Sequence, residues 1–182
     1  KKTGQIKIDI KASSIQIIKG VIPKIYIIAK DINYKDLLFE EIELEANKVK
    51  ISLKIENYEF RFKNNFIIKF KISLSENSLK KILSSYNWNW IGNIISKEIL
   101  NQQKLEEIRI KNDQIHMITR NEKDNINRDN YIDIKASNGS IYLKNRSYDK
   151  NIKIPIEEKV YIRNVNIEND LITILANSSV SF

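Results

Sequence analysis

Apolar and polar residues alternate along most of this chain, and a period of two is typical of strands with one buried face. The most regular run is Phe66, Ile68, Phe70, Ile72 and Leu74, in which every second residue is apolar. Alternation of this kind predicts strands over residues 5–12, 14–18, 24–30, 41–55, 58–63, 66–74, 106–111, 114–119, 131–137, 140–145, 159–167 and 171–176.

The apolar period changes to that of a helix after Ser75. Ser75 is suited to cap a helix N-terminus, and Glu76 then interacts favourably with the helix dipole. Apolar residues follow at helical spacing. We therefore expect helices over about residues 76–85 and 90–101, with apolar faces formed by Leu79, Ile82, Leu83, Tyr86, Ile91 and Ile95.

Turn residues separate the expected strands. Asn138-Gly139 is a strong signal for a two-residue hairpin, and Asn169-Asp170 predicts another hairpin. The alternation changes phase after Asn47-Lys48, which predicts a bend or bulge. Long antiparallel strands interrupted once by helices predict an α+β fold, and we expect residues 1–182 to form a single domain. Because one helical segment is little cover for so many strands, either the sheet curls on itself or part of its apolar face stays open, and an open apolar groove would mark a binding site.

The net charge of +8 changes the list of partners to consider. Residues 1–35 contain eight lysines and only two aspartates, so the excess is mainly N-terminal. Nucleic acid and an anionic membrane surface are the usual partners of a basic protein. The alternative is a general enrichment in Lys, Asn and Ile, which runs through the whole chain.

Several features bear on the compartment without deciding it. The chain has no cysteine, which excludes disulfides, thiol nucleophiles and cysteine metal sites. No apolar run reaches the length of a membrane span, and no signal peptide is visible. The chain begins with Lys1 rather than Met, so a trimmed leader or anchor is compatible with it. A membrane-peripheral protein, on either side of a membrane, is the expectation.

Candidate catalytic groups are scarce, and we expect no enzyme activity, metal or cofactor. His116 is the only histidine, and its alternation with Ile115 and Met117 indicates a strand surface position. No phosphate-binding glycine motif occurs among the four glycines. Glu41, Glu43 and Glu45 share one face of a strand, which indicates a solvated face. The acidic segment 121–130 lacks the spacing of an EF-hand and is expected to be a mobile loop.

Nucleic-acid binding is an alternative that the charge permits. The segment 58–63 resembles a strand on which bases stack. It contains three alternating aromatic residues, Tyr58, Phe60 and Phe62, and two basic residues, Arg61 and Lys63. Strict alternation favours a core role for these aromatic residues instead. No helix dense in Arg or Lys accompanies them, so nucleic acid is the less favoured partner.

Two stretches of the chain resemble the LmeA-like phospholipid-binding family, particularly its cyanobacterial branch. The first is IQIIKGVIPKIYIIAKDINYKDLLFEEIELEANKVKISL (15–53), with matches at Ile17, Ile18, Gly20, Ile22, Pro23, Ile25, Ala29, Tyr34 and Leu37. The second is the strand-to-helix step at Leu74, Ser75, Glu76, Leu79 and Leu83. The closing VYIRNVNIENDLITILANSSV is similar to the family's last hairpin. Asp36 replaces the usual glycine of a turn, and aspartate tolerates left-handed backbone.

The resemblance implies a tubular lipid-binding-like fold, in which a long curved antiparallel meander wraps one helical segment and leaves an elongated apolar groove. It implies non-catalytic binding or carriage of a phospholipid or another acyl-chain lipid. The expected groove residues are Phe66, Phe70, Ile72, Leu79, Ile82, Leu83, Tyr86, Ile91 and Ile95, and the family pattern includes Gly20, Pro23, Tyr34, Ser75 and Glu76.

The two tryptophans of the chain, Trp88 and Trp90, stand together at a helix end. Tryptophan favours the membrane interface, and lysines add attraction to anionic lipid. Trp88, Trp90, Lys80 and Lys81 are therefore the expected membrane-contacting lip of the groove. The alternative is that the rings pack into the core, with Trp90 as the better candidate for the core and Trp88 for the lip. A protein–protein interaction module with a filled core is the main alternative function, and the oligomeric state is open.

Overall fold

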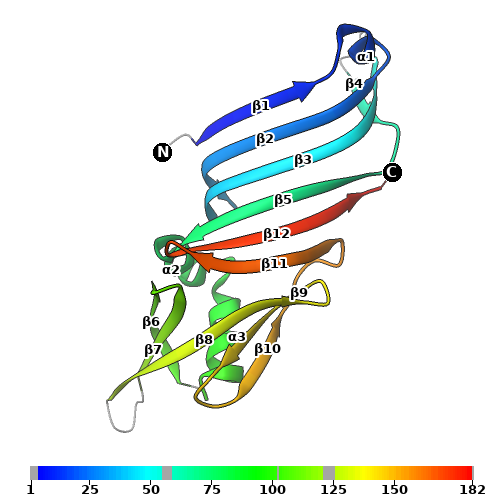
Figure 1. The fold of residues 1–182 in the computed structure, drawn as a ribbon. Helices are drawn as coiled ribbons and strands as arrows, with labels where there is room; N and C mark the ends of the chain where they lie inside the picture. The colour runs from blue at the N-terminus through cyan, green and yellow to red at the C-terminus, as the bar shows by residue number, and fades with distance from the viewer. Residues whose placement is uncertain (1–3, 55–58, 102, 121–125, 182) are drawn as a thin grey trace.

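A computed structural model describes residues 4–54, 59–101, 103–120 and 126–181. The described chain is mostly antiparallel β-structure, arranged in two sheets with three helices (Figure 1). The α+β class expected from the sequence is therefore confirmed, and most of the predicted strands and both predicted helices are present.

The first sheet contains seven strands. All of its pairings are antiparallel, and β4 pairs with the far end of β3 beside the main path. The order along that path is β1 (Gln5–Lys11), β2 (Val21–Tyr34), β3 (Leu37–Lys54), β5 (Phe66–Ser75), β12 (Leu171–Val180) and β11 (Val160–Glu168), and β4 is Glu59–Phe62.

The second sheet is a five-stranded meander that joins the edge of the first. Its order is β10 (Lys150–Ile154), β9 (Ser140–Asn145), β8 (Asn127–Ser137), β7 (Gln114–Arg120) and β6 (Lys104–Lys111). The two sheets meet where the Ile162 N–H of β11 donates to the Gly139 carbonyl at 3.0 Å. Strand β11 is therefore held on both of its sides.

Two helices, α2 (Glu76–Ser84) and α3 (Asn89–Ile99), lie between the sheets (Figure 1). Helix α2 packs against β3, β5 and β6, and α3 packs against β10 and β6. As predicted, Ser75 caps α2, since its Oγ accepts from the Ser78 N–H at 3.2 Å. Glu76 in the first turn also accepts from the Ile110 N–H at 2.9 Å, which ties α2 to β6.

Short turns with left-handed backbone connect neighbouring strands. Asn138 and Gly139 have φ values of 47° and 73°, and Asn169 and Asp170 have 52° and 58°. These values are those of the two-residue hairpins predicted at both sites. Asp36 likewise has a φ of 67° in the β2–β3 turn, so the expected left-handed turn forms without glycine.

The strand predicted over residues 14–18 is wrong. This segment is the short helix α1 (Ser14–Ile18), even though Ile15 and Ile17 alternate with polar residues. Ser13 accepts from the Gln16 N–H, and the Gln16 side chain accepts from the Ser13 N–H, which forms a capping box. The capping box stabilises a helical turn that the apolar alternation did not indicate.

The arrangement of strands also differs from one continuous meander. Strand β5 pairs with β12, although both helices and the whole second sheet lie between them in the sequence. Strand β10 was not predicted, and β8 begins at Asn127 inside the expected mobile loop. Residues 121–125 of that loop, and the predicted strand residues Ile55 and Tyr58, lie outside the described residues.

The expected bend at Asn47-Lys48 coincides with a change of partner strand. Lys48 has a φ of 55°. Strand β3 pairs with β5 as far as Ala46 and with β4 from Ile51 onwards, while its pairing with β2 keeps one register. The left-handed residue lets Ala46 and Val49 pack into the same small cluster with Ile22 and Phe66, although their spacing is odd.

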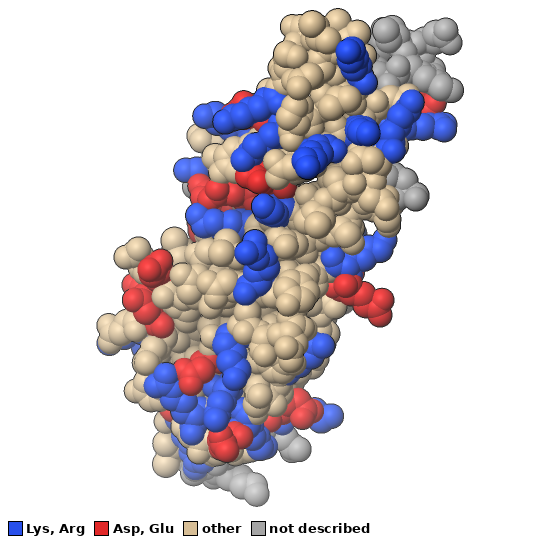
Figure 2. Space-filling view, turned by 45° about the vertical axis from the view of Figure 1, so that its right-hand side comes forward, with Lys and Arg blue, Asp and Glu red and all other residues tan. Residues whose placement is uncertain are grey.

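The polar face of the first sheet is a ladder of ion pairs. Glu41, Glu43 and Glu45 of β3 lie on this face, as the sequence predicted. Their partners come from β2 and β5: Lys30 to Glu41 at 3.3 Å, Lys71 to Glu43 at 2.7 Å, and Lys24 to Glu45 at 2.5 Å. In Figure 2 acidic and basic side chains are likewise interspersed, without a continuous basic surface in that view.

Candidate functional site

The largest apolar feature is a cavity of about 450 Å³ between the two sheets and the helices. We call it the apolar cavity. Its lining is almost wholly aliphatic or aromatic, and Glu157 is the one ionisable side chain in it. The walls are formed by Leu37, Phe39, Phe70, Ile72, Leu74, Leu79, Ile82, Leu83, Trp88, Ile91, Ile95, Ile108, Ile115, Met117, Ile134, Ile141, Leu143, Ile154, Pro155, Ile156, Glu157, Val160, Ile162, Ile172 and Ile174.

One wall of the apolar cavity continues beyond it along the first sheet. Phe70 and Ile72 of β5 line the cavity, and their directly opposite partners on β3 are Leu44 and Ile42. Residues directly opposite in an antiparallel pair share a face of the sheet. The same register leads across β2 and on to β1, so these strands extend the cavity wall as one apolar face.

This extension is open to solvent, and we call it the open strip. It consists of Ile6, Ile8, Ile10, Ile27, Ala29, Ile42 and Leu44. Ile6, Ile8 and Ile10 of β1 are 64%, 59% and 50% exposed, whereas the β2 and β3 members are half-buried. The apolar face is thus covered at the cavity and increasingly bare toward the edge strand.

Most of the predicted groove residues meet at the apolar cavity. Phe70, Ile72, Leu79, Ile82, Leu83, Ile91 and Ile95 all line it. Phe66 does not, because it lies at the other end of β5 in the small cluster with Ile22 and Val49. Tyr86 is 91% exposed, because the helical segment breaks at Ser85 and the residue falls in the linker before α3. Phe66 and Tyr86 were expected in the groove, and the structure places both of them outside the apolar cavity.

The packing expected of the two tryptophans is reversed. Trp88 lines the apolar cavity, whereas Trp90 is not among the residues that line it. Trp88 stands at the N-terminus of α3, and its Nε1–H donates to the Lys35 carbonyl in the β2–β3 turn at 2.6 Å. This bond satisfies the indole N–H while the ring packs inward. The centres of the two rings are 6.2 Å apart, so Trp90 lies next to Trp88.

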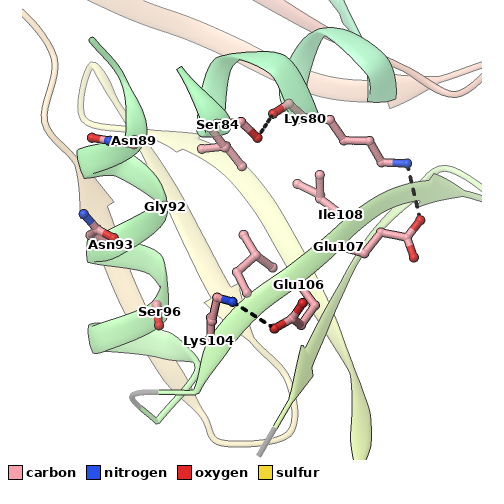
Figure 3. A pocket seen from close by; sticks show the side chains of 12 residues that line it. Lys80, Ser84, Asn89, Gly92, Asn93, Ser96, Lys104, Glu106, Glu107 and Ile108 are labelled. Carbon is pink, nitrogen blue, oxygen red and sulfur yellow. Dashed lines mark hydrogen bonds and ion pairs between the residues drawn. The ribbon is translucent and has the colours of Figure 1, made fainter. Parts of the chain in front are cut away.

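The four expected lip residues do not line one common hollow. Lys80 lines a hollow of about 550 Å³ between α2, α3 and β6, and its side chain extends along β6 to pair with Glu107 at 3.4 Å (Figure 3). It also pairs with Glu76 at 2.7 Å, and these bonds raise the pKa of Lys80. Lys81 lines a different hollow beside Asp31 and Glu40. The tryptophans and lysines therefore lie in separate environments.

The family-pattern residues have clear structural roles. Gly20 has a φ of 66°, and a Cβ there would lie 2.1 Å from the Ile51 carbonyl oxygen. Pro23 lies just beyond the last β1–β2 pair, Lys11 with Lys24, where its missing N–H is tolerated. Tyr34 is exposed in the turn that Trp88 contacts, with the Lys35 ammonium 5.5 Å from its ring centre.

The second wall of the apolar cavity was not predicted from the sequence. It comes from the inner face of the second sheet, chiefly Ile115, Met117, Ile134 and Leu143. Alternation identified these strands and their inward residues. No local pattern indicated that this sheet would face β5 across α2 and α3, since that depends on pairing between distant segments.

The single histidine of the chain, His116, is surrounded by neighbouring side chains of the second sheet. His116 is on the outer face of β7, as predicted. Its ring centre lies 4.6 Å from that of Tyr131, with the rings tilted by 60°, and its Nδ1 lies 3.3 Å from an Asp129 carboxylate oxygen. No group of three or more His, Asp or Glu side chains in the described part of the chain is arranged to hold a metal ion. No described helix is both long and apolar enough to cross a membrane.

Helix α1 carries the second exposed apolar group. Ile15 and Ile18 are 65% and 84% exposed, and Ile17 is exposed beside them. Lys11 and Lys19 flank the helix, and both are exposed. The helix lies at the end of the first sheet remote from α2 (Figure 1), and the corresponding end in Figure 2 is mostly uncharged.

Comparison with protein-family models, curated proteins and solved structures finds no match to this chain. The similarity to the LmeA-like family remains a sequence-based expectation, and function must be argued from the geometry.

Proposed function

We propose that the protein binds a phospholipid or another acyl-chain lipid, without making or breaking a bond. The observation that carries the proposal is the continuity between the apolar cavity and the open strip. A cavity of about 450 Å³ is within the range of small-ligand sites, roughly 300–1,000 Å³. An acyl chain would bury its own surface and that of the isoleucines, which is favourable at about 25 cal/mol per Å².

The open strip supports a long ligand rather than a compact one. Directly opposite residues on four neighbouring strands form a continuous apolar row from the cavity to the edge of the sheet: Phe70, Leu44, Ile27 and Ile8. A chain lying along this line would leave its polar head outside the cavity, in solvent or at a membrane. A tubular lipid-binding-like arrangement, with a curved sheet and helices enclosing a groove, is the architecture we propose for this purpose.

We place the membrane contact at α1 rather than at the tryptophans. Ile15, Ile17 and Ile18 supply apolar side chains that can enter the headgroup region, and Lys11 and Lys19 supply attraction to anionic lipids. Lys80, by contrast, is engaged with two glutamates.

The ion-pair ladder bears on the nucleic-acid alternative. Lys24, Lys30 and Lys71 are matched with glutamates of β3, so these charges do not form a basic surface for phosphates. The interaction-module alternative requires that side chains of the protein itself fill the cavity, and it is tested together with lipid binding.

Native mass spectrometry of the purified protein, followed by organic extraction, tests the proposal. We expect a near-stoichiometric lipid that is lost in the variant Ile72→Phe, because the added volume occupies the cavity. Ile67→Phe is the matched control, since Ile67 lies on the same strand with an exposed side chain on the opposite face. A protein that neither carries lipid nor takes it up from vesicles would favour the interaction module.

A further inference from the structure

We infer that β1 pairs antiparallel with β1 of a second copy, about a two-fold axis at Ile8, so that the first sheet continues across a homodimer. Strand β1 is the end strand of the sheet (Figure 1), and the end strand on the other side, β11, is already bridged to Gly139. An end strand presents a row of backbone N–H and C=O groups to which another strand can add. This inference goes beyond lipid binding and does not depend on it.

The sequence of β1, QIKIDIK, is complementary to itself when two copies run antiparallel. If Ile8 lies opposite Ile8 of the second copy, Ile6 lies opposite Ile10, and Lys7 lies opposite Asp9. The pairing therefore places two Lys–Asp pairs on the polar face and the isoleucines together on the apolar face. Opposite charges and apolar residues directly across from each other are the pairs that stabilise sheets.

The neighbouring registers are unfavourable. Centring the pair on Lys7 would bring two lysines into opposition, and centring it on Asp9 would bring two aspartates together. Any register shifted by a single residue would turn the isoleucines of one copy toward the polar face of the other. The charges thus select one register from those the backbone allows.

The charged side chains concerned form no ion pair with any described residue. Lys7 and Asp9 lie opposite Ile28 and Tyr26 of β2. The three isoleucines of β1 are each at least half exposed. In the dimer, β1 of the second copy would cover the side chains of β1 along its free edge. The open strips of the two copies would then form one apolar face.

Charge reversal tests the register. Sedimentation equilibrium without lipid should show a dimer for the unaltered chain, weakened about tenfold or more by Lys7→Asp, which sets like charges opposite each other. Asp9→Lys should do the same, and an equal mixture of the two variants should form a heterodimer. The double variant K7D/D9K should dimerise again. Lys153→Asp, an exposed lysine on the end strand β10 of the other sheet, is the control that should leave dimerisation unchanged.

Single cysteines test the axis, and they are unambiguous because the chain has no native cysteine. Directly opposite residues have Cα atoms about 4.5–5.5 Å apart, which suits a disulfide. Ile8→Cys should therefore cross-link to itself under mild oxidation. Ile10→Cys should not, since its two copies would be about 14 Å apart at 3.4 Å per residue. Ile10→Cys should instead cross-link with Ile6→Cys.

A protein that stays monomeric at high concentration would overturn the inference. So would a dimer that is unaffected by Lys7→Asp, or an Ile10→Cys variant that cross-links to itself as readily as Ile8→Cys. A monomeric protein that still carries lipid would overturn the dimer and leave the proposed function standing. A dimer that carries no lipid would support the dimer and contradict the proposed function.

Discussion

On the polar face of the first sheet, the pKa of a side chain depends on its partners on the neighbouring strands. Tyr26 of β2 lies opposite Glu45 in register and donates its hydroxyl to the neighbouring Glu43. This hydrogen bond to a carboxylate raises the pKa of Tyr26 to about 12, from an ordinary value of 10.0. The ammonium of Lys71 and the Tyr26 hydroxyl together lower the pKa of Glu43. The polar face is therefore an ordered network, not merely a solvated surface.

Replacing Glu43 with Gln should lower the pKa of Tyr26 from about 12 toward 10.0, because the acceptor loses its charge. The raised pKa makes the folded state hold the phenol proton more tightly than the unfolded chain. The linked stability is therefore fully present below pH 10 and is lost as the pH rises through 12. The titration of Tyr26 is measured by ultraviolet absorbance as a function of pH, and the curve of a Tyr26→Phe variant is subtracted to remove the other tyrosines. An unchanged Tyr26 titration in the Glu43→Gln protein would show that the bond is absent in solution.

Gly20 should be intolerant of a side chain. In Gly20→Ala the new Cβ would meet the Ile51 carbonyl at 2.1 Å in left-handed backbone. We expect a loss of about 2–4 kcal/mol in the free energy of unfolding, measured by urea denaturation. Gly92→Ala is the comparison. Gly92 lies within α3, and a Cβ there would be 3.8 Å from the Leu83 carbonyl oxygen, an ordinary contact. This variant should gain up to about 1 kcal/mol. Equal effects at both glycines would contradict this account.

Elements differ in how far their own sequence determines them. Long strands such as β3 and β5 follow directly from alternation, and the cap of α2 follows from Ser75 and Glu76. Helix α1 was misassigned because the capping box of Ser13 and Gln16 outweighs the alternation of Ile15 and Ile17. The short strand β10 was missed because it ends just before Pro155 and depends on pairing with β9. The partnership of β5 with β12 could not be predicted from local patterns, since register between distant segments is set by the packed core.

Helix α1 should determine binding to anionic vesicles. The variant carrying Ile15→Ser and Ile18→Ser should bind them about tenfold or more weakly in co-sedimentation, because two apolar side chains no longer enter the interface. Tyr86→Ser removes an equally exposed side chain at the remote end of the sheet and should have little effect. Loss of binding in Trp90→Ala but not in the α1 variant would instead restore the tryptophan lip.

The first sheet has a covered half and an open half on its apolar face. The second sheet and two helices lie over β5 and β12 and line the apolar cavity there, while the face over β1, β2 and β3 is only partly covered. The opposite face is covered by the ion-pair ladder. Part of the cavity lining was predictable, because periodicity places Phe70, Ile72, Leu79 and Ile82 on apolar faces, while the groove that they line was expected from the family resemblance. The inward position of Trp88 was not, because it depends on a bond to Lys35 across the fold.

The most direct measurement of lipid binding uses the two tryptophans as separate probes. Phospholipids brominated on the acyl chain quench only nearby indoles. In Trp90→Phe, which keeps Trp88 in the cavity wall, added brominated lipid should quench most of the fluorescence. In Trp88→Phe, which keeps only Trp90, quenching should be weaker but not absent, because the two ring centres lie only 6.2 Å apart. Strong quenching of Trp88 would place an acyl chain in the apolar cavity, whereas no quenching of Trp88 at saturating lipid would contradict the proposed function.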